Sequence, residues 1–298
     1  IDATIVILLL VLVVVFAGDQ ISRKLALQYF NPIYEGALAS TMGALTLFLF
    51  YSKNKKPLFH KNFIKLIPKY FISGVIFSTM NIVGLFGLQF TSASRASVLL
   101  FTFPIFVTIL QRYIYKEHVS TNKKIGLLIS YLGIILVFND AIVNWGFDTN
   151  QFRGDLLITL SALLLATSII WVRDISISNP KIDPETATLW QLTFSLPFFW
   201  FATIFEPNDL KNSLTIFPII GLIYHGLIIT LAILIRSKLV VIYDPSMISS
   251  FFFLTPSIAI MLSWLLLDEK ITISLISGAI LTGIGILFIY SKNKYIIR

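Results

Sequence analysis

Apolar runs long enough to cross a lipid bilayer recur along almost the entire chain. A membrane-spanning helix needs about 20 predominantly apolar residues, because the hydrocarbon core of a bilayer is roughly 30 Å thick. Apolar runs between charged, Gly and Pro breaks predict ten helices, at roughly 3–26, 33–51, 70–90, 94–115, 122–138, 154–173, 186–205, 215–238, 246–267 and 273–290. Charged residues make up only 13% of the chain, whereas globular domains carry about 25%. We therefore expect an all-α integral membrane protein with ten transmembrane helices.

The residue types that are missing or scattered exclude several kinds of chemistry. The chain has no cysteine, so disulfides, thiolate catalysis and cysteine-ligated metals are excluded, and its three histidines form no HExxH motif. We expect no metal and no cofactor. The net charge of +8 would suggest nucleic acid in a soluble protein, but here the basic residues lie in short loops between apolar runs. The lipid bilayer is the expected partner, and nucleic acid is not.

The distribution of basic residues predicts the orientation of the helices. If the N-terminus is cytoplasmic, seventeen of the 23 basic residues fall in the inner loops and the C-terminal tail. The remaining six fall on the outer side: Arg23, Lys24, Arg95, Arg153, Lys211 and Lys270. Because short cytoplasmic loops carry an excess of Lys and Arg, we expect both termini to be cytoplasmic.

The two halves of the chain share a pattern at an offset of 152 residues. Without gaps, the alignment pairs Pro104 with Pro256, Glu117 with Glu269, Gly126 with Gly278 and Gly133 with Gly285. We therefore expect two five-helix repeats, at residues 1–140 and 154–292. Because five is an odd number, the second repeat must enter the membrane from the opposite side. Such inverted repeats are typical of secondary transporters.

Two long stretches resemble a known family. Residues 87–120, GLQFTSASRASVLLFTFPIFVTILQRYIYKEHVS, run from a helix end through an Ala-Ser turn into a helix with a central Pro and a closing Glu. Residues 247–290, MISSFFFLTPSIAIMLSWLLLDEKITISLISGAILTGIGILFIY, repeat this unit. The chain resembles the drug/metabolite transporter (DMT) superfamily, and within it the EamA-like ten-helix family. It departs from the pattern at Ala39, near a position where members often carry Arg.

The resemblance implies a secondary active transporter of the cell inner membrane that works by alternating access. It implies export of a small polar metabolite, with amino acids as the first substrate class, and no enzymatic activity. Transport of a nucleotide-derived or anionic metabolite is the main alternative, and an intramembrane enzyme or a passive channel is a more distant one. Tyr243-Asp244 matches half of an intramembrane aspartyl protease signature, but no Gly-x-Gly-Asp accompanies it. Proton coupling and the oligomeric state both stay open.

One proline and one glutamate occur at matching positions in each repeat. Pro104 and Pro256 lie near the middle of predicted helices, where each removes a backbone donor and should bend its helix. The bend is either a hinge facing a cavity or a static kink. Glu117 and Glu269 lie just before the last helix of each repeat, and we expect them to act as structural caps of those helices.

Asp19 and Arg236 are the charged candidates for a substrate site. An intramembrane carboxylate is costly and normally faces a bundle interior or a wet cavity, so Asp19 is expected to line the substrate path. The alternative is an Asp19–Arg23 pair, four residues apart, that closes the outer rim of the first helix. Arg236 either snorkels to the cytoplasmic headgroups or, in the register of the repeat, lies deeper and suits an anionic substrate group.

Further polar side chains fall within the predicted spans. We expect the substrate to bind near the midplane between the first four helices of each repeat. The remaining candidate binding residues are Gln20, Asn81, Thr102, Gln191, Tyr224, His225, Ser249 and Ser250. Most hydroxyls in such helices bond to their own backbone. A single histidine is most often a packing residue, but its charge changes near neutral pH, which leaves His225 open to a role in proton coupling.

Overall fold

Helices are the only regular elements in the part of the chain that the structure describes. The structure is a computed structural model, and it describes residues 3–53, 59, 63–115, 121–143, 149–179, 182–206, 215–243, 248 and 251–290. Seven helical stretches within it are long and apolar enough to cross a membrane: Ile5–Ala26, Pro32–Lys53, Phe63–Phe90, Ala93–Ile114, Thr149–Ser178, Pro184–Phe205 and Ile216–Ile242. Shorter apolar helices lie at Lys124–Gly133, Thr255–Leu267 and Ile273–Gly285.

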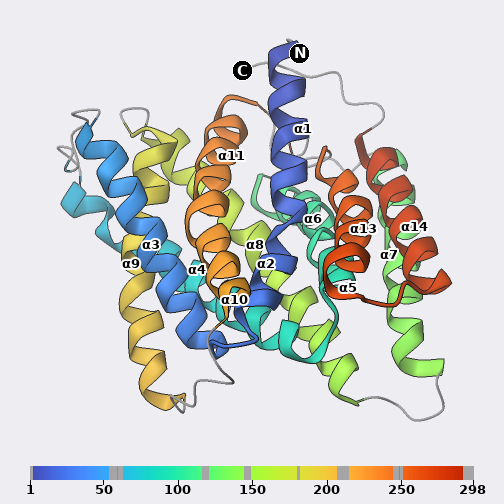
Figure 1. The fold of residues 1–298 in the computed structure, drawn as a ribbon. Helices are drawn as coiled ribbons and strands as arrows, with labels where there is room; N and C mark the ends of the chain where they lie inside the picture. The colour runs from blue at the N-terminus through green and yellow to red at the C-terminus, as the bar shows by residue number, and fades with distance from the viewer. Residues whose placement is uncertain are drawn as a thin grey trace.

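The helices run up and down the bundle, and the start of α1 and the end of α14 lie at the same upper end (Figure 1). The α-helices of the first half are α1 (Ala3–Ala17), α2 (Asp19–Ala26), α3 (Pro32–Lys53), α4 (Phe63–Phe90), α5 (Ala93–Leu100), α6 (Phe103–Tyr115) and α7 (Thr121–Val143). The second half has α8 (Thr149–Ser178), α9 (Pro184–Ala202), α10 (Ile216–Ile223), α11 (Thr230–Ile242), α13 (Thr255–Leu267) and α14 (Ile273–Tyr290). The short elements are η1 (Thr203–Phe205), η2 (Tyr224–Ile229) and η3 (Phe252–Leu254).

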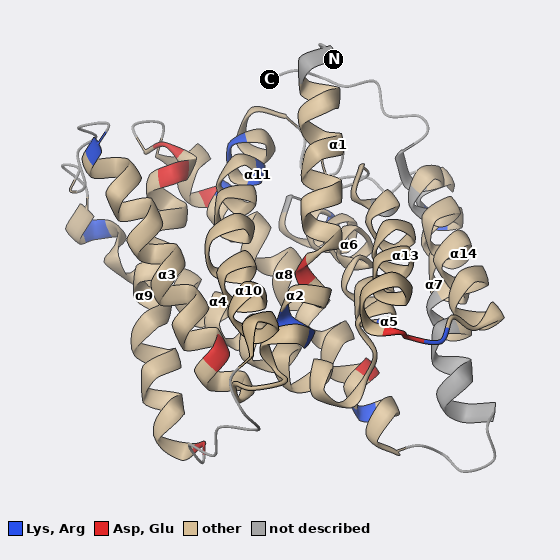
Figure 2. Cartoon of the chain, in the orientation of Figure 1, with Lys and Arg blue, Asp and Glu red and all other residues tan. Residues whose placement is uncertain are grey.

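The outer surface of the bundle is strongly apolar. Large apolar side chains project outward with half or more of their surface exposed, among them Ile7, Val11, Val14, Leu45, Leu49, Leu128, Phe201, Ile220, Leu265 and Ile280. Charged residues gather mainly near the helix ends, with a group on α2 as an exception (Figure 2). Exposed apolar surface of this extent marks contact with lipid. The protein is therefore a multi-pass membrane protein.

Several membrane-length stretches are interrupted near their middle. The first breaks at Gly18, between α1 and α2, and another breaks at Phe101 and Thr102, between α5 and α6. The 3-10 turn η3 directly precedes α13, and the π-helix η2 separates α10 from α11. Non-helical backbone at membrane depth is tolerated only where protein buries it or a cavity adjoins it. We therefore expect buried protein contacts or a cavity beside these interruptions.

Local contacts and prolines accompany the interruptions at Gly18, before α6 and before α13. At Gly18 the backbone packs so closely on Tyr224 that a Cβ atom would lie 2.6 Å from its phenol oxygen. The Tyr224 hydroxyl donates a hydrogen bond to the Val15 carbonyl at 2.8 Å, and this carbonyl also accepts the Gly18 N–H at 3.2 Å. Pro104 and Pro256 each follow an irregular turn and begin the next helix, in the position that tolerates a missing donor.

Helices α7 and α14 form a closely packed antiparallel pair at one side of the bundle (Figure 1). A Cβ atom at Gly133 would lie 2.7 Å from the carbonyl oxygen of Gly278, and one at Gly285 would lie 2.5 Å from that of Gly126. Between these two contacts the Ser130 hydroxyl donates to the Thr282 carbonyl at 3.2 Å. Small residues let helix backbones approach this closely in a membrane.

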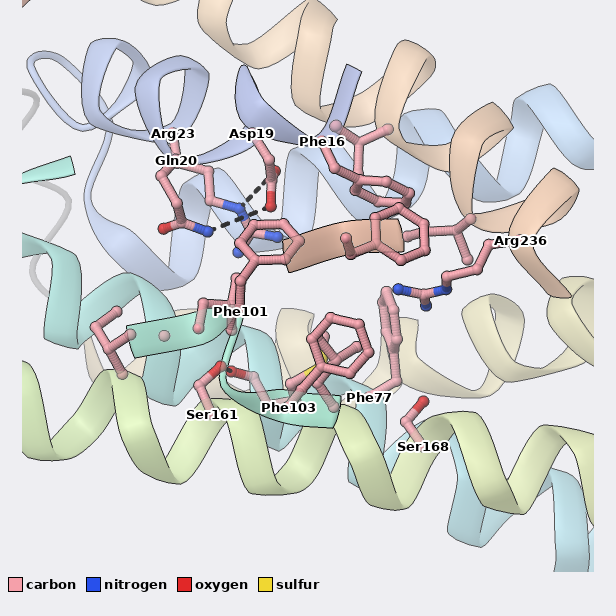
Figure 3. A pocket seen from close by; sticks show the side chains of 18 residues that line it. Phe16, Asp19, Gln20, Arg23, Phe77, Phe101, Phe103, Ser161, Ser168 and Arg236 are labelled. Atoms are coloured by element: carbon pink, nitrogen blue, oxygen red, sulfur yellow. Dashed lines mark hydrogen bonds and ion pairs between the residues drawn. The ribbon is translucent and has the colours of Figure 1, made fainter. Parts of the chain in front are cut away.

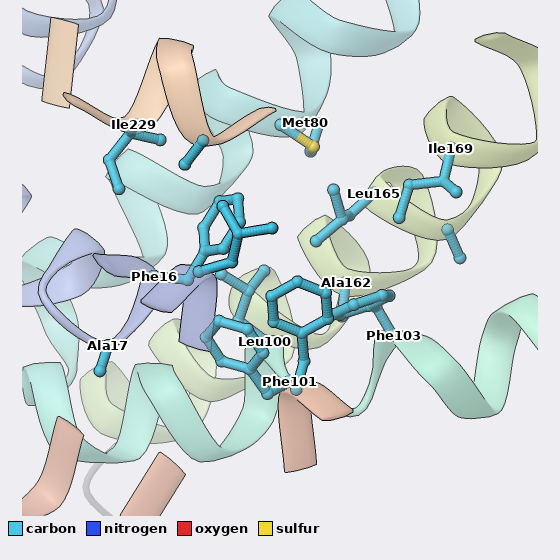
Figure 4. Close-up of a cluster of buried hydrophobic side chains, with 14 of the residues drawn as sticks. Phe16, Ala17, Met80, Leu100, Phe101, Phe103, Ala162, Leu165, Ile169 and Ile229 are labelled. Carbon is cyan, nitrogen blue, oxygen red and sulfur yellow. The ribbon is translucent and has the colours of Figure 1, made fainter. Parts of the chain in front are cut away.

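The largest buried cluster fills the centre of the bundle. Phe16, Leu100, Phe101 and Phe103 come from the ends of α1, α5 and α6 and meet side chains of α4 and α8 there (Figure 4). Because each of these phenylalanines adjoins a helix break, the apolar core and the interruptions occupy the same region. A second cluster lies between the start of α4, the end of α8 and the start of α9.

Candidate functional site

A cavity opens where the interrupted helices meet. It holds about 680 Å³ of empty space, including its opening to the surroundings. Its walls come from both sides of the breaks at Gly18 and at Phe101–Thr102, from η3 and the π-helix, and from α4, α8 and α11. Lining residues are Phe16, Asp19, Gln20, Arg23, Phe77, Met80, Gly84, Leu100, Phe101, Phe103, Ile158, Ser161, Leu165, Ser168, Ile229, Ile233, Arg236 and Phe252 (Figure 3).

One end of the cavity holds a buried ion pair on α2. The Arg23 guanidinium donates to the Asp19 carboxylate at 2.9 Å, and the Gln20 amide donates to the same carboxylate at 3.3 Å (Figure 3). Both charged side chains are less than a tenth exposed. The pair expected from the four-residue spacing is present, but it lies inside the bundle and not at the outer rim. The break at Gly18 starts a new helix directly before Asp19 and turns this pair toward the cavity.

Arg236 on α11 points into the cavity from another direction (Figure 3). Its side chain is buried, and its guanidinium carbon lies 5.4 Å from the centre of the Phe16 ring. No hydrogen bond or ion pair joins it to another described residue. The snorkelling interpretation is therefore wrong for Arg236, because the π-helix and α11 carry it inward. Lys238 lies outside the cavity lining and pairs with Glu185 of α9.

Phenylalanine rings separate the two charged regions. Phe252 contacts Phe16 edge-to-face, with ring centres 5.3 Å apart, and lies 6.2 Å from Phe103 and 6.4 Å from Phe101. Sequence reasoning did not single out these residues, since the chain has 26 phenylalanines and nothing local distinguishes these. Their position directly beside the helix breaks is the signal that could have identified them.

A second, smaller cavity of about 310 Å³ adjoins the first. Arg23, Phe77, Met80, Ile229 and Ile233 line both cavities. The second cavity is also lined by His225 of the π-helix and by Asn81, two of the residues expected at a substrate site. The Asn81 amide also donates to the Phe77 carbonyl at 3.0 Å.

Glu35 was missed by sequence reasoning and lies beside this second cavity. His225 Nδ1 lies 2.6 Å from Glu35 Oε1, and the Glu35 side chain is fully buried. Its other oxygen, Oε2, has no hydrogen-bond partner. An acidic residue in the first turn of a helix is ordinary, which is why Glu35 did not stand out beside Pro32. Its partner lies 190 residues away in the chain.

The other predicted binding residues lie elsewhere. The Gln191 amide donates to the hydroxyls of Ser73 and Ser168, at 2.8 and 2.9 Å, and so joins three helices. The Thr102 hydroxyl donates to the Leu99 carbonyl, three residues earlier in the chain. The Tyr224 hydroxyl donates to the Val15 carbonyl beside the break at Gly18. None of these three lines either cavity. Ser249, Ser250 and Glu117 lie outside the described residues.

Glu269 caps a different helix from the one expected. Its carboxylate accepts the backbone N–H groups of Ala93 and Ser94, at 2.7 and 2.9 Å, and so caps the start of α5 in the first half of the chain. The start of α14 is instead capped by Thr272, whose hydroxyl accepts the Leu275 N–H at 3.2 Å. Lys24, expected at the outer rim, donates to the carbonyls of Leu88 and Thr91 next to this cap. Of these contacts, those of Glu269 join the two halves of the chain.

The chain matches the family model described as the EamA-like transporter family at residues 3–139 and again at 152–291. It is 26% identical over 282 residues to the uncharacterized transporter YoaV of Bacillus subtilis, which covers 92% of this chain and 93% of that protein. It is 27% identical to the uncharacterized transporter YdfC of the same organism, over 91% of this chain and 86% of that protein.

Two further likenesses are more distant. A WAT1-related chloroplastic protein of Arabidopsis thaliana is 27% identical over 67% of this chain and 49% of its own length. A solved crystal structure superimposes with a TM-score of 0.69 over 96% of both chains, at 11% sequence identity, which supports the fold alone. The family model accounts for nearly the whole chain, once in each half. The protein belongs to the EamA-like transporter family of the DMT superfamily.

Proposed function

We propose that this protein exports an amino acid across the cell inner membrane by alternating access. The observation that carries this proposal is the distribution of charge in the central cavity. The Asp19 carboxylate suits the ammonium group of an amino acid, and Arg236 suits its carboxylate. The two lie apart in the cavity, with phenylalanine rings between them that suit an apolar remainder (Figure 3).

The arrangement of helices supports alternating access. Discontinuous helices near the middle of the membrane form the substrate site in many secondary transporters, and the cavity here adjoins three helix breaks and a π-helix. We propose ten transmembrane helices with both termini cytoplasmic. Opposite rocking of the two halves of the bundle around the cavity would expose the substrate to each side of the membrane in turn. The helices would bend at the breaks before Pro104 and Pro256.

The contacts of α7 and α14 support an inverted repeat at residues 1–140 and 154–292. Gly133 packs on Gly278, and Gly285 packs on Gly126. At the offset of 152 residues, Gly133 corresponds to Gly285 and Gly126 to Gly278, so the two contacts are equivalent with the roles of the two helices exchanged. Ser130 bonds to Thr282, its own counterpart at the same offset. A pseudo-two-fold axis between two antiparallel helices produces this pattern, as an inverted repeat requires.

An anionic or nucleotide-derived metabolite is the second candidate substrate. Arg236 favours it, because a buried guanidinium without a hydrogen bond or ion pair to another described residue is ready to bind an anion. Asp19 argues for a substrate that also carries a positive charge, although its present pairing with Arg23 reduces its negative field. The names of the relatives favour a transporter over an intramembrane enzyme.

Counterflow in proteoliposomes tests the proposal. Purified protein is reconstituted, each vesicle batch is loaded with one unlabelled amino acid, and the same labelled amino acid is added outside. In a carrier with alternating access, label that enters is diluted by the unlabelled internal pool, so outward transport carries mostly unlabelled substrate and label accumulates for a time. A passive channel only equilibrates the label. Vesicles without protein and vesicles loaded with a different amino acid are the controls.

Transient accumulation of one amino acid would establish the carrier and its substrate. If no amino acid accumulates while an organic or nucleotide anion does, the substrate assignment is wrong and the anionic alternative replaces it. Equilibration without accumulation, for every solute that enters, would contradict alternating access itself.

A further inference from the structure

We propose that Glu35 and His225 form a proton-binding site that couples proton entry to substrate export. This proposal rests on the proposed transport function and adds its coupling ion. The two side chains meet at 2.6 Å in the buried part of the bundle, next to a cavity that shares a wall with the substrate cavity. No residue assigned to the substrate cavity above belongs to this pair.

The pair differs by one charge between two protonation states. A hydrogen bond between Nδ1 and Oε1 requires one proton between the two atoms. With that proton alone, a neutral imidazole and a carboxylate carry a net charge of −1. A second proton makes the pair an imidazolium and a carboxylate, or two neutral groups, with no net charge. A buried charge is costly, and Oε2 of Glu35 has no hydrogen-bond partner to stabilise it. The pair therefore binds and releases one proton.

The backbone around His225 is suited to a site that moves. His225 lies in the π-helix η2, and π-helical turns occur frequently at functional sites. The same segment supplies Tyr224, which bonds to Val15 beside the break at Gly18, and Ile229, which lines both cavities. A movement of η2 at the Glu35–His225 pair would therefore be transmitted through Tyr224 to the helix break at Gly18.

The charged surroundings point to Arg23 as the group that responds. The titratable side chains on the near halves of the elements that pack against the pair are Asp19, Arg23 and Lys24 on α2, Tyr34 on α3, Glu206 after η1, Tyr224 on η2 and Arg236 on α11. Helices α1 and α10 contribute no titratable side chain. Glu206 is occupied by the backbone N–H groups of Ile33 and Tyr34. Of this set, Arg23 alone lines the second cavity together with His225.

Competition for Arg23 links the proton to the substrate. When the pair is neutral, the Arg23 guanidinium stays on the Asp19 carboxylate at 2.9 Å, and Asp19 is not free for an ammonium group. When the pair loses its proton and carries −1, it attracts Arg23 through the second cavity and releases Asp19. The substrate then binds. Each turnover carries one proton inward on the pair and one substrate molecule outward, and the two sites are never filled together.

The test compares counterflow with accumulation driven by a pH gradient. The probe is the labelled amino acid that gives counterflow, and the membrane potential is held at zero with K⁺ and valinomycin. With the vesicle interior one pH unit more acidic, one-for-one exchange accumulates the probe about tenfold, which corresponds to roughly 1.4 kcal/mol. The variants are His225→Gln and the double variant Glu35→Gln/His225→Gln, whose two amides can still form a neutral hydrogen bond.

The matched control is Lys69→Gln, which removes a charge from the half-exposed ion pair with Asp174 at 3.4 Å. We expect the control to accumulate the probe like the unmodified protein. His225→Gln leaves the Glu35 carboxylate, so it should keep counterflow within about twofold but lose the pH-driven accumulation, because exchange needs no net proton movement. The double variant is neutral at every pH, so Arg23 should stay on Asp19 and both counterflow and accumulation should be lost.

Three results would overturn the proposal. Variants that still accumulate the probe about tenfold would place the proton elsewhere, and an unmodified protein with counterflow but no pH-driven accumulation would be a facilitator. Loss of counterflow in both variants would make the pair part of substrate binding or of folding. Absence of counterflow for every solute in the unmodified protein would instead overturn the transport function itself, and the coupling with it.

Discussion

Arg236 is the residue whose position most affects the proposed substrate. Its side chain is buried and lines the cavity, and its guanidinium lies over the Phe16 ring. A buried charge of this kind is stabilised when an anion binds, and a planar guanidinium can hold a carboxylate with two parallel hydrogen bonds. A lysine at this position would offer one point charge and would not reproduce that geometry.

Arg236→Gln should weaken substrate binding by about 10- to 100-fold, because a hydrogen bond to a charged group contributes roughly 1.5–3 kcal/mol. Arg236→Lys should fall between this variant and the unmodified protein. The measurement is the concentration dependence of counterflow. Lys238→Arg, two residues along the same helix, is the control because it keeps the ion pair with Glu185. Equal affinities for all four proteins would remove Arg236 from the binding site.

Asp19→Asn should reduce the counterflow rate about tenfold or more, because the amide cannot replace the carboxylate as a charged partner of an ammonium group. The chain should still fold, since Arg23 lines both cavities and the guanidinium left behind can be hydrated there. Size-exclusion chromatography of the detergent-solubilised variant checks the fold. An unchanged transport rate would leave Asp19 with the ion pair as its only role.

At the scale of elements, the break between α5 and α6 is a candidate hinge. Pro104 cannot donate a backbone hydrogen bond, and the two residues before α6 leave the helix beside the cavity. Pro104→Ala restores a donor and allows a continuous helix from Ala93 to Tyr115. We expect the maximal counterflow rate to fall roughly tenfold while the half-saturating substrate concentration changes little, because conformational steps often limit turnover.

Pro218→Ala is the matched control for this change. Pro218 lies in the first turn of α10, where a helix has no backbone partner for the missing donor. Its replacement should leave transport unchanged. If Pro104→Ala transports like the control, the break is a static kink that shapes the cavity and does not bend.

The contact of α7 with α14 predicts a strong effect of a single methyl group. A Cβ atom at Gly133 would lie 2.6 Å from the backbone nitrogen of Thr282, which is too close for any real contact. Gly133→Ala should therefore lower the melting temperature in detergent by several degrees, because overpacking typically costs about 1–3 kcal/mol. Leu132→Ala on the exposed side of the same helix should have little effect. Equal melting temperatures would contradict the packing.

At the scale of the whole molecule, the proposed orientation is testable by cysteine labelling. The chain has no native cysteine, so each introduced thiol is the only one present. Gln28→Cys, after α2, should react with a membrane-impermeant maleimide in intact cells, because that turn is expected outside. Ser52→Cys, near the end of α3, should react only after permeabilisation. Both positions are exposed. The reverse pattern would invert the proposed topology.

Much of the architecture could be predicted from the sequence because the information is local. An apolar run reveals a membrane helix without knowledge of its neighbours, and the four-residue spacing of Asp19 and Arg23 predicted their ion pair. The same reasoning left open whether that pair lies at the rim or in the cavity, and whether Arg236 lies at the headgroups or deeper. Both alternatives depended on where the side chains point after the break at Gly18 and after the π-helix at 224–229, which the sequence does not reveal.

The sequence by itself determined the class of the protein: its apolar runs require lipid, and its repeated pattern resembles a family of transporters. Only the tertiary structure decided which polar residues share a cavity. Glu35 meets His225 across 190 residues, and Glu269 caps a helix 176 residues before it. Such contacts depend on how distant helices pack, whereas hydrophobicity is a property of each residue alone. Burial and packing then decide which charges find a partner within the protein and which, like Arg236, make no ion pair with another described residue and are proposed to bind the substrate.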